Sequence, residues 1–316
     1  MTLTSDTKAP TGRPHDRILA MRGIDKKFGA VQALTEIDLE VNAGEVVAIV
    51  GDNGAGKSTL VKVLAGVHPP DGGTIEFDGA RVAIPTPTDA QNLGIATVFQ
   101  DLALCDNLDV VSNLWLGREL TASGTLDEVQ MEQRSWTLLR ELSAKIPSVR
   151  IPVASLSGGQ RQTVAIARSL IGEPRIVILD EPTAALGVAQ TAEVLNLIER
   201  LRERGHGVIL ISHNMADVMA VADRVVVLRL GRNNGVFNVS DVTSETIIAA
   251  ITGATDNAVT RRAAALAGAV VEEDEFLEHH VAHAASEVQD PVAAAPDAAG
   301  DDIPPTTERA EEGDHA

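Results

Sequence analysis

Short apolar runs alternate with amphipathic segments along most of the chain. The runs are rich in Val, Ile and Leu and are bounded by Gly, Pro or charged residues, which is typical of strands. They are RILAMRGI, EIDLEV, EVVAIV, GTIEFDG, IATVFQ, RIVILD, GVILIS and RVVVLRLG. Apolar positions recur at helical spacing over 57–65, 88–93, 109–117, 128–145, 158–171, 188–204 and 214–222. Strands that alternate with helices predict an α/β fold with a mainly parallel sheet.

The same pattern divides the chain into three parts. Residues 1–16 are polar and are expected to be a flexible leader, and residues 17–253 are expected to form one domain. Within it, the strands over roughly 17–50 and 73–83 are expected to form a separate antiparallel β layer. From 254 to 316 the chain is rich in Ala and acidic residues; 262–287 favours a helix and 288 onward favours disorder. The simplest interpretation of this segment is a solubilising tail.

Composition restricts the function classes. The net charge of -19 argues against broad electrostatic binding to nucleic acid. Cys105 is the single cysteine, so the chain forms no internal disulfide, and we expect this thiol to be partly buried and unreactive. The N-terminus lacks the apolar core of a signal peptide, and no apolar stretch approaches the ~20 residues of a membrane helix. We therefore expect a soluble chain without direct membrane insertion, attached to a membrane only through protein.

A glycine-rich loop interrupts the strand EVVAIV. The sequence GDNGAGKST matches G-x-x-x-x-G-K-[ST] with Gly51, Gly56, Lys57 and Ser58. Glycines allow successive backbone N–H groups to surround an anion, and a following helix adds its positive N-terminus. Lys57 would contact the β- and γ-phosphates, and the Ser58 hydroxyl would bind Mg²⁺. The alternative is a plain strand–turn–helix, which leaves the GKST sequence unexplained.

A second strand ends in two acids. RIVILDEP places Asp180 and Glu181 directly after an apolar run. A carboxylate at the end of a buried parallel strand suits Mg²⁺ coordination near phosphates, which is the role we expect for Asp180. Glu181 is positioned to orient and deprotonate an attacking water. Without the phosphate loop, the same dipeptide would be an ordinary solvated turn.

Between these two motifs, LSGGQ at 156–160 resembles the signature of ABC transporter ATP-binding subunits, and the resemblance covers about residues 17–240. It implies a P-loop NTPase with an inserted helical subdomain at about 101–157, and two ATP molecules sandwiched between two such chains. It further implies that Phe28 stacks on adenine. The implied ATP-binding set is Phe28, Gly51, Asp52, Asn53, Gly54, Ala55, Gly56, Lys57, Ser58, Thr59, Ser157, Gly158, Gly159 and Gln160.

The resemblance also assigns catalytic roles. Gln100 resembles the glutamine that contacts Mg²⁺ or water and senses the membrane partner, and His213 resembles the switch histidine that contacts the γ-phosphate. The implied catalytic residues are Glu181, His213, Lys57 and Gln100. The implied metal site is Ser58, Gln100 and Asp180.

The stretch VFQDLALCDNLDVVSNLWLGREL resembles bacterial importers of ribose, xylose and fructose. This implies a peripheral subunit on the cytoplasmic side of the cell membrane that works as a homodimer or with a paired ATPase. Its other partners would be transmembrane permease subunits, which would dock in a groove near 100–117, and, indirectly, a periplasmic or lipid-anchored sugar-binding protein. An ABC exporter, a non-transport ABC protein on ribosomes or DNA, and a non-hydrolysing regulatory subunit are the alternatives.

Two features depart from the family pattern, and one motif in the tail lies outside it. Many ATPases of the sugar subgroup carry two ATP-binding halves, and this chain has one. Gly187 stands where the family usually has an Asp that links the two nucleotide sites. The tail contains HHVAH, with His279, His280 and His283, whose spacing permits metal binding in a helix, although no fourth ligand is in view.

Overall fold

The computed structural model describes residues 17–122 and 124–254. The chain divides into two compact units, Met1–Asn257 and Ala258–Ala316, and all described residues belong to the first. The expected leader, the expected helix at 262–287, the disorder from 288 and the HHVAH histidines lie outside the described residues.

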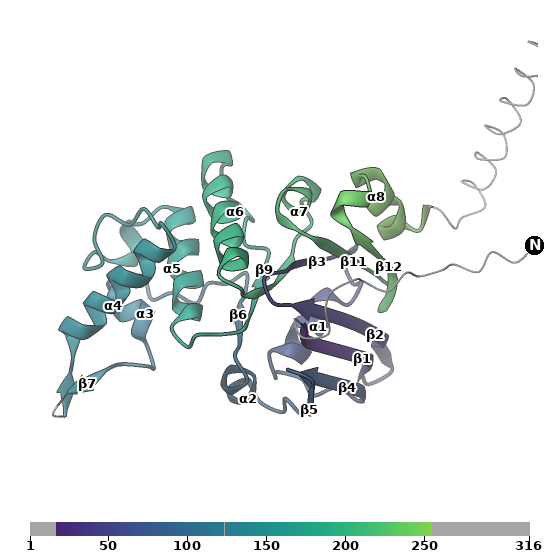
Figure 1. Cartoon of the computed structure of the whole chain (residues 1–316), viewed down its shortest axis with the longest axis horizontal. Helices are drawn as coiled ribbons and strands as arrows, with labels where there is room; N and C mark the ends of the chain where they lie inside the picture. The colour runs from purple at the N-terminus through teal and green to yellow at the C-terminus, as the bar shows by residue number, and fades with distance from the viewer. Residues whose placement is uncertain (1–16, 123, 255–316) are drawn as a thin grey trace, which may run out of the picture. The chain divides into compact units, whose positions relative to one another are not determined.

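A six-stranded sheet forms the centre of the described unit (Figure 1). Its order is β12-β11-β3-β10-β9-β6, and all strands are parallel except β12 at one edge. The inner strands are almost entirely buried, as expected for a parallel sheet that is covered on both faces. The bounds are β3 Val46–Val50, β6 Ile95–Val98, β9 Ile176–Asp180, β10 Gly207–Ile211, β11 Arg224–Arg229 and β12 Arg232–Asn238.

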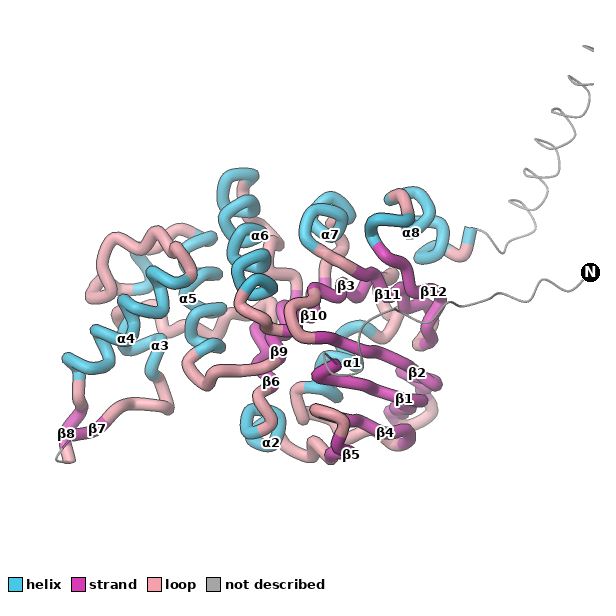
Figure 2. Tube along the Cα trace, viewed as in Figure 1, coloured by secondary structure: helices cyan, strands magenta, loops and turns pink. Residues whose placement is uncertain are grey.

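A second, antiparallel sheet has the order β2-β1-β4-β5 (Figure 2). It consists of β1 Arg17–Phe28, β2 Val31–Asn42, β4 Gly72–Phe77 and β5 Ala80–Val82. The expected antiparallel layer is therefore correct, but its boundary at about residue 50 is wrong. β3 belongs to the parallel sheet, because all five of its residues are buried and neither of its faces is left for solvent.

The parallel sheet separates two hydrophobic cores. Along β3, Val47 and Ile49 face one core, whereas Val46, Ala48 and Val50 face the other. The first core contains α1 Lys57–Leu64, α2 Pro87–Asn92 and the antiparallel sheet. The second contains α5 Gly158–Leu170, α6 Val188–Glu203, α7 Met215–Val221 and α8 Ser244–Thr252. Helix α1 is thus packed between the two sheets, which fixes the position of its N-terminus.

The region expected to be a helical subdomain contains helices and one small hairpin. Its elements are α3 Val110–Trp115, β7 Thr121–Ala122, β8 Thr125–Leu126, α4 Glu128–Glu141 and the 3₁₀ turn η1 Val153–Ser155. The fully buried Asn113 organises the approach to α3: its amide donates to the carbonyl of Cys105 and accepts from the N–H of the same residue. The indole of Trp115 donates to the carbonyl of Met131 and so ties α3 to α4.

Most of the expected strands and helices are present, with differences at the ends. The helix expected over 128–145 stops at Glu141, because Ser143 has a positive φ of 51° that a helix cannot continue through. The sequence pattern misses β12, whose Asn- and Gly-containing sequence is half exposed, and α8, which ends at Gly253 in a left-handed conformation. A second 3₁₀ turn, η2 Val239–Asp241, joins β12 to the segment before α8.

Candidate functional site

The candidate site lies at the carboxyl ends of the parallel strands. The phosphate loop follows β3, His213 follows β10, Asp180 ends β9 and Gln100 follows β6. These four strands are consecutive neighbours in the sheet, and Ile211 of β10 pairs with both Ile49 and Asp180. Residues far apart in the sequence are therefore brought to one edge, where ligands of open α/β sheets bind.

The glycines of the phosphate loop are required by its geometry. Gly51 has φ 155°, and a Cβ there would lie 2.3 Å from the Leu228 carbonyl oxygen. Gly56 has φ 105°, and a Cβ there would lie 2.8 Å from Leu34 Cδ2. Both positions combine a backbone conformation that favours glycine with backbone or core atoms that leave no room for a side chain. The loop is consequently held in one shape by β2 and β11.

This loop forms one wall of a cavity of about 380 Å³. The other walls are Val31–Ala33 of β2 and the turn at Leu230 and Gly231. Lys57 Nζ donates to the Gly51 carbonyl at 2.7 Å and to the Asp52 carbonyl at 3.0 Å. In the described part of the chain, no side chain caps the N-terminus of α1, and its first turn carries no acid. The N–H groups of that turn and the lysine together make an anion site.

At the end of β9, the carboxylate of Asp180 is electrostatically unfavourable. Burial raises its pKa, and the negative charge of Glu181 raises the pKa further, whereas Lys57 and Lys62 act in the opposite direction. A carboxylate oxygen is therefore held at the end of β9 within electrostatic reach of Lys57. Within residues 17–122 and 124–254, no cluster of three or more His, Cys, Asp or Glu side chains forms a metal site by itself.

Glu181 and His213 are in direct contact. Glu181 Oε2 lies 2.8 Å from His213 Nδ1; the carboxylate is 16% exposed and the imidazole 74% exposed. The Glu181 backbone has φ 51°, a left-handed conformation that is uncommon for a residue with a side chain. Its N–H donates to the Ile211 carbonyl at 2.9 Å, which ties it to the end of β10. A carboxylate in this position can accept a proton from water near the phosphate loop.

The signature motif begins α5. Ser157 Oγ accepts from the Gln160 N–H, Gln160 Oε1 accepts from the Ser157 N–H, and Gln160 Nε2 donates to the Lys145 carbonyl. A Cβ at Gly158 would lie 3.0 Å from Leu186 Cδ2, just before α6, and a Cβ at Gly159 would lie 3.0 Å from Gln190 Cβ in α6. None of the residues lining the phosphate-loop cavity in the described structure comes from this motif. The motif therefore presents a second helix N-terminus, apart from the first.

Two other expected site residues lie at the periphery. Phe28 is 43% exposed, and its ring meets the edge of His68 at a centroid distance of 5.1 Å. Lys26 Nζ lies 5.6 Å from the same ring. Phe28 is not among the described residues that line the phosphate-loop cavity, and Gln100 is exposed. Nothing in the sequence indicated these neighbours, because only tertiary packing brings Val31–Ala33 to the loop and brings His68 and Lys26 to Phe28.

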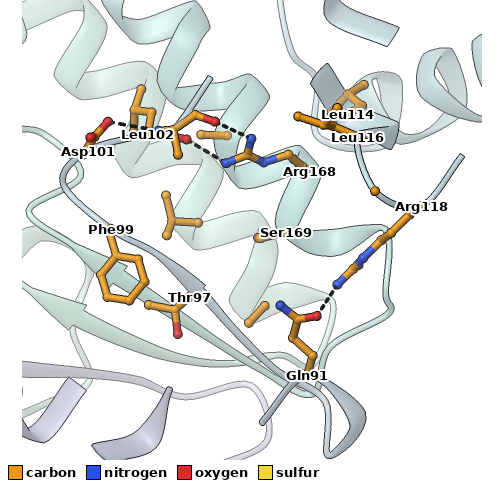
Figure 3. A pocket seen from close by; sticks show the side chains of 15 residues that line it. Gln91, Thr97, Phe99, Asp101, Leu102, Leu114, Leu116, Arg118, Arg168 and Ser169 are labelled. Carbon is orange, nitrogen blue, oxygen red and sulfur yellow. Dashed lines mark hydrogen bonds between the residues drawn. The ribbon is translucent and has the colours of Figure 1, made fainter. Parts of the chain in front are cut away.

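A groove of about 370 Å³ lies beside Gln100, between the end of β6, α3 and α5 (Figure 3). Arg168 of α5 donates to the carbonyls of Leu102 and Ala103, and burial lowers the pKa of its guanidinium. The partly exposed side chains of Phe99 and Leu116 add apolar surface. The groove expected near residues 100–117 is therefore present, and Arg168 links its wall to the signature helix.

Comparison with known proteins agrees with this geometry. The family model described as ABC transporter matches residues 34–184. A xylose/arabinose import ATP-binding protein of Sulfolobus acidocaldarius is 46% identical over 215 residues, which cover 68% of this chain and 86% of that protein. A fructose import ATP-binding protein of Rhizobium meliloti is 43% identical over 245 residues, or 75% and 94% of the two chains. A ribose import ATP-binding protein of Rubrobacter xylanophilus is 43% identical, but the match covers only 43% of that longer chain.

Solved structures give the same result. The ADP conformation of MJ1267, an ATP-binding cassette of an ABC transporter, matches with a TM-score of 0.65 and 26% identity, over 75% of this chain and 95% of that one. The cbiO1 protein of Clostridium perfringens, part of an ABC transporter complex, matches with a TM-score of 0.64 and 30% identity, over 74% and 93%. The expected fold and the expected enzyme class are confirmed: the chain belongs to the ATP-binding subunits of ABC transporters and has their P-loop ATPase fold.

Proposed function

We propose that this ATPase drives the import of a monosaccharide through separate permease subunits. The observation that carries the proposal is the convergence of the phosphate loop with the Glu181–His213 pair on neighbouring strand ends. The sugar class rests on relatives that are named for xylose/arabinose and fructose import and are matched over 86% and 94% of their lengths.

ATP binds with its phosphates against the loop at 51–59. When the β- and γ-phosphates enter, Lys57 exchanges its hydrogen bonds to the Gly51 and Asp52 carbonyls for bonds to phosphate oxygens. The unpaired N–H groups at the start of α1 take the remaining oxygens. The adenine ring of ATP lies toward the ring of Phe28, which is 43% exposed and so offers a surface for stacking.

Mg²⁺ fits the donors at this edge, since Ser58 and Asp180 offer the hydroxyl and carboxylate oxygens that the ion prefers. When bound, the ion would neutralise charge that develops on the transferred phosphoryl group. Gln100, which follows β6, would contact the ion or a water molecule.

In hydrolysis, Glu181 accepts a proton from the water whose oxygen attacks the γ-phosphorus. His213 donates from Nδ1 to Glu181 Oε2 across their 2.8 Å contact and so fixes the orientation of the carboxylate. Lys57 and the exposed edge of the imidazole stabilise negative charge on the γ-phosphoryl oxygens. The bond to the β-phosphate oxygen breaks, leaving ADP and phosphate.

The second half of each site comes from another copy or a paired ATPase. The N-terminus of α5, with Ser157, Gly158, Gly159 and Gln160, faces a γ-phosphate across the dimer, because it does not line the phosphate-loop cavity of its own chain. A structure titled as a dimeric post-hydrolysis state of the cassette MJ0796, bound to ADP and phosphate, is 25% identical to this chain.

Gly187 caps α6 without a side chain, and within the described structure a Cβ there would meet nothing within 4 Å. The departure at this position therefore reflects no lack of space.

The membrane partner is a permease that docks in the groove beside Gln100, on the cytoplasmic side of the cell membrane. No helix in the described ranges 17–122 and 124–254 is long and apolar enough to cross a membrane. Closing and opening of the ATPase pair moves the groove and α5 together, because Arg168 of α5 donates hydrogen bonds to the Leu102 and Ala103 carbonyls in the groove wall. A sugar-binding protein on the opposite side of the membrane delivers the substrate.

Replacement of the proposed base tests the chemistry. Glu181→Gln keeps the size and oxygen of the side chain but removes its basicity. We expect kcat for ATP to fall by about 10²–10⁴-fold, with the Kd for ATP unchanged. The matched control is the exposed Glu203→Gln on α6, which should turn over normally. Turnover of Glu181→Gln at the wild-type rate would contradict the assignment.

Replacement of Asp180 has opposite effects on stability and ligand binding. Its folded pKa is raised, so its stabilising contribution exists at low pH and is lost as pH rises through the folded pKa. Asp180→Asn should therefore raise the Tm of the nucleotide-free protein at pH 7 and abolish the further rise caused by Mg-ATP. In the control Asp241→Asn, the native pKa is lowered by hydrogen bonds from Asn238 and Ser240, so Tm should not rise. A lower Tm for Asp180→Asn without nucleotide would refute this account.

Uptake tests the transport role. Deletion of the gene that encodes this chain from its native host should abolish the energy-dependent uptake of one labelled sugar among xylose, arabinose, fructose and ribose. Wild-type chain should restore uptake, and Lys57→Ala should not, because it lacks the phosphate-binding ammonium. Unchanged uptake of all four sugars, together with loss of efflux of another compound, would indicate an exporter instead.

A further inference from the structure

The loop that carries the proposed base is strained. Glu181 has φ 51° and Ala185 has φ 60°, both in the left-handed region that residues with side chains rarely occupy. Such conformations are strained and persist only where the surrounding structure holds them. The loop therefore needs anchors outside itself.

Two anchors fix the start of the loop. The Glu181 N–H donates to the Ile211 carbonyl, and the Glu181 carboxylate contacts His213. Within the loop, the Ala184 N–H donates to the Glu181 carbonyl and the Leu186 N–H donates to the Thr183 carbonyl. These last two bonds shape the turn but do not attach it to the rest of the protein.

A third anchor holds the middle of the loop. Thr183 Oγ1 donates to Asp217 Oδ2 at 2.6 Å, and Asp217 is only 5% exposed. The short distance and the burial of Asp217 make this a well-formed hydrogen bond that is shielded from water. Asp217 lies in the first turn of α7, where the helix dipole favours a negative charge.

Helix α7 also follows directly after His213. Asn214 caps the helix by accepting from the Ala216 N–H, and its own N–H donates to the buried Ser212 hydroxyl. The segment that presents His213 is thus rigidly joined to the residue that holds Thr183. The loop at 181–186 and the segment at 212–217 are joined by two side-chain contacts, one between Glu181 and His213 and one between Thr183 and Asp217.

We propose that Thr183 and Asp217 are positioning residues, whose hydrogen bond holds the strained Glu181 loop in register with His213 for attack on the γ-phosphate. This inference rests on the proposed role of Glu181 as general base. Neither side chain touches ATP; Asp217 acts through Thr183, and Thr183 acts through the loop backbone. Loss of the bond lets Glu181 relax toward an ordinary backbone conformation and move away from the water.

The test removes the hydroxyl and keeps the shape. In the full-length chain, Thr183→Val should lower kcat by about 10- to 100-fold, the usual cost of misplacing a catalytic group by about 1 Å, while KM for ATP stays within about twofold. Thr183→Ser keeps the donor and should restore most of kcat. Wild-type kcat in Thr183→Val, or an equal loss in Thr183→Ser, would overturn the proposal.

A double-mutant cycle separates positioning from folding. Asp217→Ala should lower kcat as Thr183→Val does, and the double variant should be no slower than the worse single variant, because the two side chains act as one unit. Multiplicative losses would show that the two side chains act independently, and a fall in Tm with kcat unchanged would show that the pair serves only stability; either result overturns the proposal. Glu181→Gln is measured in parallel: if that variant retains turnover, the proposed function itself fails, whereas an inactive Glu181→Gln beside a fully active Thr183→Val rejects the positioning role alone.

Discussion

The packing of α1 between the two sheets is the constraint on which the site depends. Leu60, Val61, Val63 and Leu64 are buried in the core shared with the antiparallel sheet, so the N-terminus of α1 has one position relative to β3. The intervening loop has no freedom to move away, because atoms of Leu34 and Leu228 occupy the space that side chains at Gly56 and Gly51 would need. The anion site is therefore a consequence of core packing, formed before any ligand binds, and such preorganisation is what electrostatic catalysis requires.

Three groups at the carboxyl ends of the parallel strands are placed where a nucleotide would interact with them. Lys57 donates to two loop carbonyls, the pKa of the half-buried Asp180 is raised by burial and by Glu181, and Glu181 is held in a left-handed conformation. In the proposed function, Mg-ATP would offer phosphate oxygens to Lys57 and positive charge to Asp180. Strained backbone of the kind seen at Glu181 is common where catalytic groups are held.

The sequence predicts those features that depend on neighbouring residues, and it does not predict those that depend on the order and register of the strands. The phosphate loop, Asp180, Glu181 and His213 follow predicted strands, and the parallel sheet brings them to one edge as expected. The register that makes β10 the neighbour of both β3 and β9 is not local, so the contact of Glu181 with His213 had no sequence signal of its own. The same is true of the Thr183–Asp217 bond, of His68 against Phe28, and of the membership of β3 in the parallel sheet. Polar β12 lacked an apolar alternation, because only its pairing with β11 makes it a strand.

The N-terminus of α5 does not line the phosphate-loop cavity of its own chain, and from this separation we infer that a second chain completes each hydrolytic site. The most direct test is the rate of Mg-ATP hydrolysis per chain as the concentration of the purified protein is raised. Sites shared between two chains predict a rate per chain that rises with concentration and then levels off, in step with ATP-dependent dimer formation measured by light scattering. A rate per chain that is constant over the range in which the protein passes from monomer to dimer would contradict the account.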